Sequence, residues 1–173
     1  GGLVSCDDDL ELSNPNSQTT EAFWETGDHA IEGINAAYNS MIIDGYYMRM
    51  TPALTDGRGD DFTGDSPWLD LVQAGNFTLL PTSGPIQWMW SAYYQQVFRT
   101  NQVLTNVPEI EMDENVKERV LGQAYFLRAF AYFHLVTNFE RVPLITTVPE
   151  NEDEYYPPTA SQEEIWNQII SDL

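Results

Sequence analysis

Basic side chains are scarce in this sequence. It contains 7 Lys and Arg residues against 27 Asp and Glu residues, so the formal net charge is −20 over 173 residues. Such a surface repels the phosphate backbone of DNA and RNA, which argues against nucleic-acid binding. It also repels anionic lipid headgroups, so we expect any attachment to a membrane to be covalent. Neutral ligands are unaffected by this charge.

Cysteine and long apolar runs are also lacking. The single cysteine, Cys6, excludes a disulfide within the chain. No window approaches the roughly 18 consecutive apolar residues that a bilayer-spanning helix requires. Hydrophobic residues nevertheless make up 42% of the chain and aromatic residues 13%. This content is too high for a disordered acidic tail, and the length suits one domain with a core.

The signatures of common catalytic and metal sites are absent as well. His29 and His134 are isolated, and no His-Glu-x-x-His or Gly-x-Ser-x-Gly motif occurs. Paired carboxylates are abundant and leave a glycosidase pair open, although 27 acidic residues produce such pairs by chance. We therefore predict a protein that is not an enzyme and that has no cofactor. His134 is expected to pack against a helix neighbour.

The first residues resemble the end of a bacterial lipoprotein signal peptide. Leu3-Val4-Ser5-Cys6 resembles a lipobox, in which small residues precede the cysteine that becomes the acylated first residue. Residues 1–5 are thus predicted to be a signal-peptide remnant, with Cys6 as the lipidation site. Residues 6–19 are predicted to be an acidic and polar tether. Acidic residues after such a cysteine resemble the signal for the outer face of the Gram-negative outer membrane, and a solvated linker is the alternative.

Apolar residues at helical spacing predict four helices. They cover residues 20–43, 86–106 and 113–137, and a last helix opens at Ser161. The third helix is apolar on several sides, so we expect it to be packed on several sides. Ser161 and Glu164 fit a capping box. Between the helices, residues 45–85 and 141–160 are expected to be long irregular loops. The last apolar stripe is still running at Leu173, so we expect the chain to continue.

The third predicted helix carries a motif that resembles the signature of the SusD/RagB family. The motif reads Phe126-Leu127-Arg128-Ala129-Phe130-Ala131-Tyr132-Phe133-His134-Leu135-Val136, followed by Phe139 and Val142-Pro143-Leu144-Ile145. Three other segments are similar to the family in the same order: Arg58-Gly59-Asp60-Asp61, Asn101 to Leu104, and Glu163 to Leu173. Glu140 departs from the pattern, since a Gly usually stands there.

This resemblance implies a mostly α-helical fold with helix pairs similar to tetratricopeptide repeats and an irregular ligand-binding region. Residues 20–173 would be the N-terminal part of that domain, with the C-terminal remainder missing. The family's members are lipid-anchored on the outer membrane surface. They act as a lid that delivers oligosaccharides, or in some branches peptides, to a SusC-like TonB-dependent transporter.

The loop after the first helix supplies the candidate ligand-binding residues. Sugar recognition needs an aromatic face for the C–H side of the ring and polar groups for its hydroxyls. Trp68 could supply the face, and the polar contacts could come from Arg58, Asp60, Asp61 and Asp65. Alternatively, the aspartates cap turns and Trp68 fills the core. The same carboxylates do not match an EF-hand, so we predict no metal site.

A second group of aromatic residues begins the helix predicted at residues 86–106. Trp88 and Tyr93 are expected to face outward and Trp90 and Tyr94 inward, so the first two are weaker candidates for ligand contact. Tyr46 and Tyr47 are similar weak candidates.

Four functions follow for testing. The leading hypothesis is a surface lipoprotein that binds oligosaccharide without turnover. The alternatives are a peptide-binding, RagB-like member of the same family, a glycoside hydrolase on a helical scaffold, and a structural helical adaptor.

Overall fold

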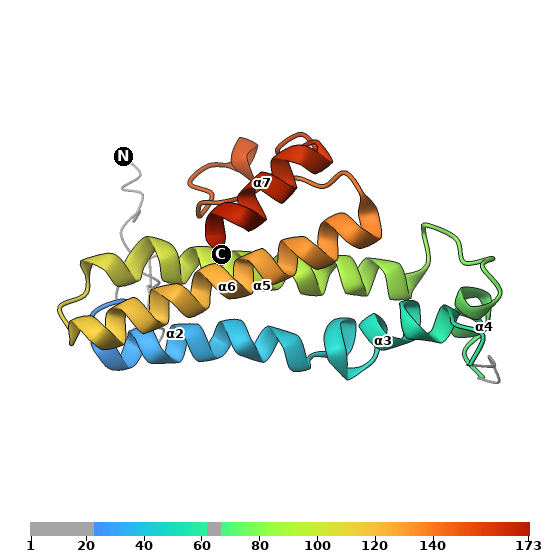
Figure 1. Cartoon of the computed structure of the whole chain (residues 1–173), viewed down its shortest axis with the longest axis horizontal. Coiled ribbons are helices and arrows are strands. Elements are labelled where there is room, and N and C mark those ends of the chain that lie inside the picture. Colours follow the sequence, from blue (N-terminus) through green and yellow to red (C-terminus); the bar gives the residue numbers. More distant parts are fainter. Residues whose placement is uncertain (1–22, 62–66) are drawn as a thin grey trace, which may run out of the picture.

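The computed structural model describes residues 23–61 and 67–173, and these residues are mostly α-helical. Three long helices lie side by side: α2 (Gly27–Asn39), α5 (Gly84–Asn106) and α6 (Glu114–Phe139) (Figure 1). A fourth, α7 (Gln162–Asp172), packs on α6. The described residues contain no β-strand, only an isolated bridge between Pro143 and Thr159. The predicted helical fold class is confirmed.

The first helix begins later than the sequence suggested. Thr26 caps α2, because its side chain accepts a hydrogen bond from the backbone N–H of His29. The helix ends at Asn39 and continues as one 3-10 turn, η1 (Ser40–Ile42). Trp24, just before the cap, folds back so that its ring lies against Gly33, where a Cβ atom would collide with it. A side chain at this position would displace Trp24.

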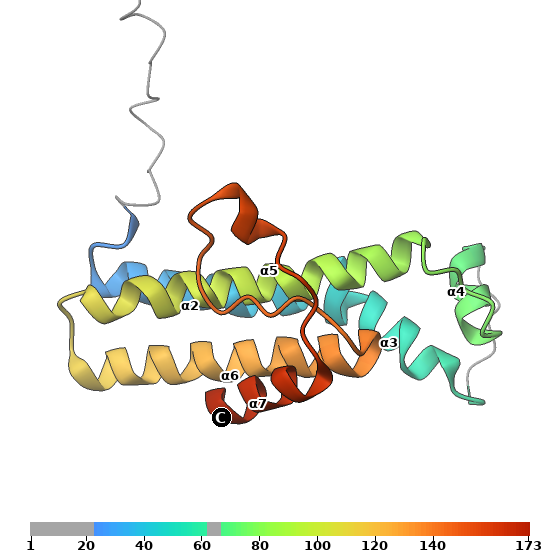
Figure 2. The ribbon, with the colours of Figure 1, turned by 90° about the horizontal axis from the view of Figure 1, so that it is seen from above.

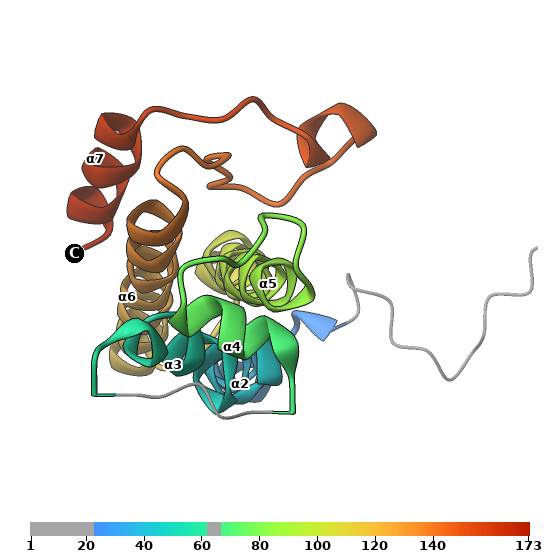
Figure 3. The same ribbon diagram turned by 90° about the vertical axis from the view of Figure 1, so that its right-hand side faces the viewer.

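The stretch 45–85 is not a long irregular loop, contrary to our expectation. Its described part forms four short helices that close one end of the bundle (Figures 1 and 3). Each of these helices is short because glycines and Pro52 interrupt the stretch. Three of them contribute buried apolar side chains to the core, among them Tyr46, Met50 and Ala74. They are η2 (Asp44–Met48), α3 (Met50–Leu54), η3 (Asp56–Arg58) and α4 (Leu69–Gly75).

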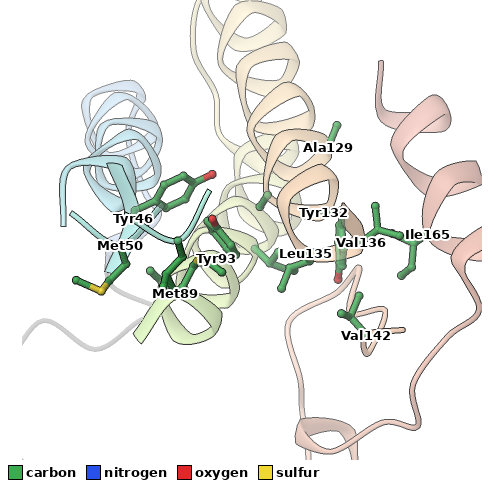
Figure 4. Packing of buried hydrophobic residues seen from close by; sticks show 14 of the residues in the cluster. Tyr46, Met50, Met89, Tyr93, Ala129, Tyr132, Leu135, Val136, Val142 and Ile165 are labelled. Atoms are coloured by element: carbon green, nitrogen blue, oxygen red, sulfur yellow. The ribbon is translucent and has the colours of Figure 1, made fainter. Parts of the chain in front are cut away.

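Helix α6 is the centre of the molecule, as its apolar circumference predicted. It contacts α2, α5 and α7. Asp113 caps its start by accepting from the N–H of Val116. The predicted stripe is buried, with Ala124, Leu127 and Leu135 all at 0% exposure. One cluster of buried residues joins α6 to the short helices and α7, and Figure 4 shows Tyr46 and Tyr93 meeting within it. A second cluster joins α6 to α2.

The conserved-looking arginine of the motif joins four parts of the chain. Arg128 forms a two-bond ion pair with Asp172 of α7, with contacts of 2.7 and 2.8 Å, and both side chains are buried. It also donates to the Asn101 side-chain oxygen on α5 and to the carbonyl of Thr146. Asn101 donates in turn to the carbonyls of Ile145 and Thr147. The segment after α6 is therefore fastened across α5 and α6.

That segment, residues 141–160, crosses the bundle and leads to α7. Figures 2 and 3 show it passing over α5 and α6, with the short 3-10 helix η5 (Glu152–Tyr155) above α5 and α7 beside α6. The capping box predicted at the start of α7 is present between Ser161 and Glu164. Its hydrogen bonds from Ser161 lower the pKa of the Glu164 carboxyl.

Candidate functional site

Trp68 stands immediately before α4 and is half-buried against a second tryptophan. Its ring centroid lies 5.5 Å from that of Trp88 on α5, and the two rings are tilted by 53°. Trp88 is 45% exposed, so the pair presents aromatic surface to solvent. The indole N–H of Trp68 donates to an Asp70 carboxylate oxygen at 2.9 Å, which fixes the orientation of the ring.

Charged groups border this tryptophan pair. The guanidinium carbon of Arg49 lies 5.7 Å from the centre of the Trp68 ring, within the range of a cation–π contact. The Nε atom of Arg49 lies 3.2 Å from an Asp44 carboxylate oxygen, and both side chains are about half-exposed. The rim thus places one guanidinium and two carboxylates beside the aromatic rings.

A depression of about 370 Å³ lies beside Trp88, between α5 and the start of η2. Its α5 wall includes Ser91 and Gln95, and Asp44 and Gly45 form the opposite wall. Gly45 permits this close approach, because a Cβ there would collide with the backbone carbonyl of Trp88. The depression therefore adds a hydroxyl and an amide to the polar groups around the tryptophan pair.

Together these residues, which we call the Trp68–Trp88 surface, suit a neutral ligand with a flat apolar side and several hydroxyl groups. Aromatic faces contact C–H groups, whereas carboxylates, amides and guanidinium bind hydroxyls. Among residues 23–61 and 67–173, no group of three or more His, Cys, Asp or Glu side chains is placed to hold a metal ion.

The other predicted site residues lie apart from this surface. Arg58, at the end of η3, lines a separate depression of about 330 Å³ that includes Phe77 and Asn138. Asp60 and Asp61 follow it and are exposed. Asp65 lies outside the described residues. The structure therefore brings Trp68 together with Trp88, Arg49 and Asp44, and not with Arg58.

Two of the tyrosines considered as outward candidates are core residues. Tyr93 was expected to face outward, but it is fully buried, stacks on His134 at 5.0 Å and hydrogen-bonds to Thr51 at 2.8 Å. Burial raises the pKa of its hydroxyl to about 12. Tyr46 is also fully buried and donates to Gln96. The short helices of residues 44–58 cover this side of α5, which a helical period alone did not reveal.

His134 is packed among aromatic rings, as expected from its position in the helix. Its Nε2 atom lies 2.9 Å from the hydroxyl of Tyr47, and the ring contacts Tyr46, Tyr93 and Phe130. Burial lowers the pKa of the imidazole to about 4. The side chain is consequently neutral at physiological pH and carries out a packing role.

Comparisons with known proteins agree with the fold and with the chemistry of this surface. Residues 10–173 match a SusD-like family model described as "starch-binding associating with outer membrane". SusD-like protein P38 of Formosa agariphila is 31% identical over 175 residues, which cover 100% of this chain and 34% of that protein. A SusD-like protein of Bacteroides ovatus is 27% identical over 175 residues, covering 99% and 31% of the two chains. The chain belongs to the SusD-like family, a family of carbohydrate-binding proteins.

Solved structures give the same result. A laminarin-binding SusD-like protein superposes with a TM-score of 0.75 and 31% identity, over 86% of this chain and 33% of the other. A SusD superfamily protein from Bacteroides vulgatus has a TM-score of 0.75 and 25% identity, over 87% and 34%. The chain spans about a third of the length of these relatives. No helix in the described residues has the length and apolar character needed to cross a membrane.

Proposed function

We propose that the chain is the N-terminal part of a surface lipoprotein that binds an oligosaccharide and delivers it to a SusC-like TonB-dependent transporter. The observation that carries this proposal is the pair of tryptophans bordered by Arg49, Asp44 and Asp70. The similarity to a laminarin-binding protein supports a glycan as the ligand class. The protein acts by binding, without turnover, as a lid over the transporter.

The Trp68–Trp88 surface gives a direct test of glycan binding. In the whole protein, Trp88→Ala should weaken binding of laminarihexaose or maltohexaose about tenfold, because the ligand loses an aromatic contact. Trp68→Ala should have a similar effect. Isothermal titration measures both affinities. Arg58→Ala, Asp60→Ala, Asp61→Ala and Asp65→Ala test the remaining predicted contacts in the same assay.

Trp166→Ala is the matched control, since Trp166 is 38% exposed on α7 and lies outside this surface. It should bind the oligosaccharides as the unaltered protein does. Titration with oligopeptides tests the peptide-binding alternative, and binding of peptides alone would overturn the proposal. Release of reducing ends from either oligosaccharide would show an enzyme instead of a binding protein.

The membrane anchor is a separate part of the proposal. Residues 1–5 would be the signal-peptide remnant, Cys6 the acylated residue, residues 6–19 the tether and residues 20–173 the start of the helical domain. The lipobox-like sequence and the family's association with the outer membrane support this division. Mass spectrometry of the protein from native membranes should find acyl groups on Cys6, and an unmodified cysteine there would contradict the anchor.

A further inference from the structure

A second aromatic cleft lies on a different face of α5. Trp90, Tyr94 and Phe98 form one wall at helical spacing, and Tyr155 and Tyr156 stand opposite them at the end of η5. The cavity between the walls has a volume of about 420 Å³, within the range of small-molecule sites. Trp88 and Trp90 lie about 200° apart around the helix, so this cleft and the Trp68–Trp88 surface face different ways.

The helix wall is held in place by contacts outside the cavity. Trp90 packs edge-on against Phe139 at 4.9 Å and contacts Tyr94 at 4.9 Å. The Tyr94 hydroxyl donates to the carbonyl of Pro143 at 2.7 Å. Asn101, at the inner end of the wall, is engaged by Arg128 and by two carbonyls. The rings are therefore preorganised, and a ligand need not order them.

The opposite wall is exposed to solvent. Tyr156 is 84% exposed and Tyr155 is 55% exposed, while Phe98 across the cleft is 45% exposed. Tyrosine loses little conformational entropy on contact with a ligand and offers both a ring face and a hydroxyl. Aromatic faces on both sides of a cavity can hold a flat or chair-shaped ring between them.

A smaller polar cavity of about 190 Å³ adjoins the cleft and shares Ile145, Pro149 and Pro157 with it. Thr146, Thr147 and Glu154 line this extension. Threonine hydroxyls both donate and accept hydrogen bonds, and a carboxylate accepts them. The combination of aromatic walls and a polar end matches a ring that carries hydroxyl groups at its edge.

The charges of the cleft exclude other classes of ligand. An anion would face Glu154 in a molecule of net charge −20. A cation would need a free carboxylate, but both oxygens of Glu154 already accept hydrogen bonds, from the N–H of Glu150 and the amide of Asn151. We propose that this cleft is a second carbohydrate-binding site that holds a neutral pyranose ring between the α5 aromatics and Tyr156. The ligand class rests on the proposed function, but the residues are different.

The test uses the whole protein with laminarihexaose and maltohexaose as probes. Tyr156→Ala and Phe98→Ala should each weaken binding of the preferred probe about threefold to tenfold, as expected for the loss of one ring contact. Tyr38→Ala is the matched control, because Tyr38 is 40% exposed on α2 and lines neither site. Thermal unfolding of each variant checks that the fold is intact.

A second measurement separates the two sites. In a Trp88→Ala background, saturation-transfer NMR should still detect the hexasaccharide, and the signal should disappear when Tyr156→Ala is added. Binding that is insensitive to Tyr156→Ala and Phe98→Ala would overturn the cleft and leave the proposed function standing. So would a Trp88→Ala protein that binds no saccharide at all.

The remaining outcomes are also decisive. An unaltered protein that binds neither hexasaccharide would reject the proposed function and the second site together. Tyr156-dependent binding of tetralysine, with no effect on saccharides, would replace the pyranose by a cationic ligand and overturn the inference.

Discussion

At Glu140 the backbone adopts a conformation that residues with a side chain rarely take. Its φ of 63° and ψ of −66° form a tight turn in which the N–H of Arg141 donates to the carbonyl of Phe139 at 2.7 Å. This type of γ-turn is strained for any residue except glycine. The strain explains why the resemblance predicts a glycine here: the chain must reverse at the end of α6 to start the segment that crosses the bundle.

Replacing this residue should therefore stabilise the protein. We expect Glu140→Gly to raise the free energy of unfolding by about 1 kcal/mol, because the positive φ no longer clashes with a Cβ. Urea denaturation followed by circular dichroism measures the change. Glu118→Gly is the matched control: Glu118 is exposed in the middle of α6, and the same substitution there should cost about 1 kcal/mol. Equal effects of the two variants would contradict this account.

At the scale of the helices, Arg128 connects α5, α6, α7 and the crossing segment. Its partner Asp172 is 2% exposed and Arg128 is 7% exposed, so neither charge is solvated. Removing one member leaves the other buried without a counter-charge, which costs about 3–5 kcal/mol. We expect Arg128→Met to lower the free energy of unfolding by that amount, measured by urea denaturation.

The exposed pair provides the comparison. Arg49→Met breaks an ion pair with Asp44 whose side chains are 50% and 44% exposed, and it should change stability by less than about 1 kcal/mol. A double variant, Arg128→Met with Asp172→Leu, should recover part of the loss, since no charge then remains buried. If Arg128→Met cost no more than Arg49→Met, Arg128 would have no special part in joining the helices.

The sequence predicted helices where the signal is local. The stripes of α5 and α6 and the capping box at Ser161 need only neighbouring residues, and all three are found. The start of α2 was misplaced because several threonines can cap a helix. Thr26 is favoured by the packing of Trp24 on Gly33, which is a tertiary contact. The short helices between residues 44 and 75 were missed because tertiary burial stabilises them more than their own sequence does.

The candidate site was predictable only in part for the same reason. Trp68 was recognised from its residue type and its acidic loop. Its contact with Trp88 joins residues 20 positions apart, and Arg49 reaches it from another short helix. No spacing rule links these three positions. Tyr93 shows the converse: a helical period separates two faces of α5, but it does not say that both are covered.

At the scale of the whole molecule, pH acts on stability in two opposite directions. The net charge of −20 repels itself at neutral pH, and mild acid relieves this repulsion by protonating carboxylates. His134 works against that gain. Its pKa is about 4 in the folded protein and 6.5 for an unperturbed histidine, because the folded protein buries the ring. As the pH falls below about 6.5, the unfolded chain takes up a proton that the folded chain excludes.

The contribution of His134 should therefore be complete above about pH 6.5 and lost as the pH falls toward 4. At about pH 4.5 it should lower the free energy of unfolding by about 2 kcal/mol relative to pH 7. His134→Gln keeps a hydrogen-bonding partner for Tyr47 but cannot titrate. Urea denaturation of both proteins at the two pH values isolates the effect, because the carboxylates are common to both. The unaltered protein should lose more stability on acidification than His134→Gln does. Parallel pH profiles would show that protons reach His134 as easily in the folded protein as in the unfolded chain, and that the aromatic packing around it does not exclude the charged form.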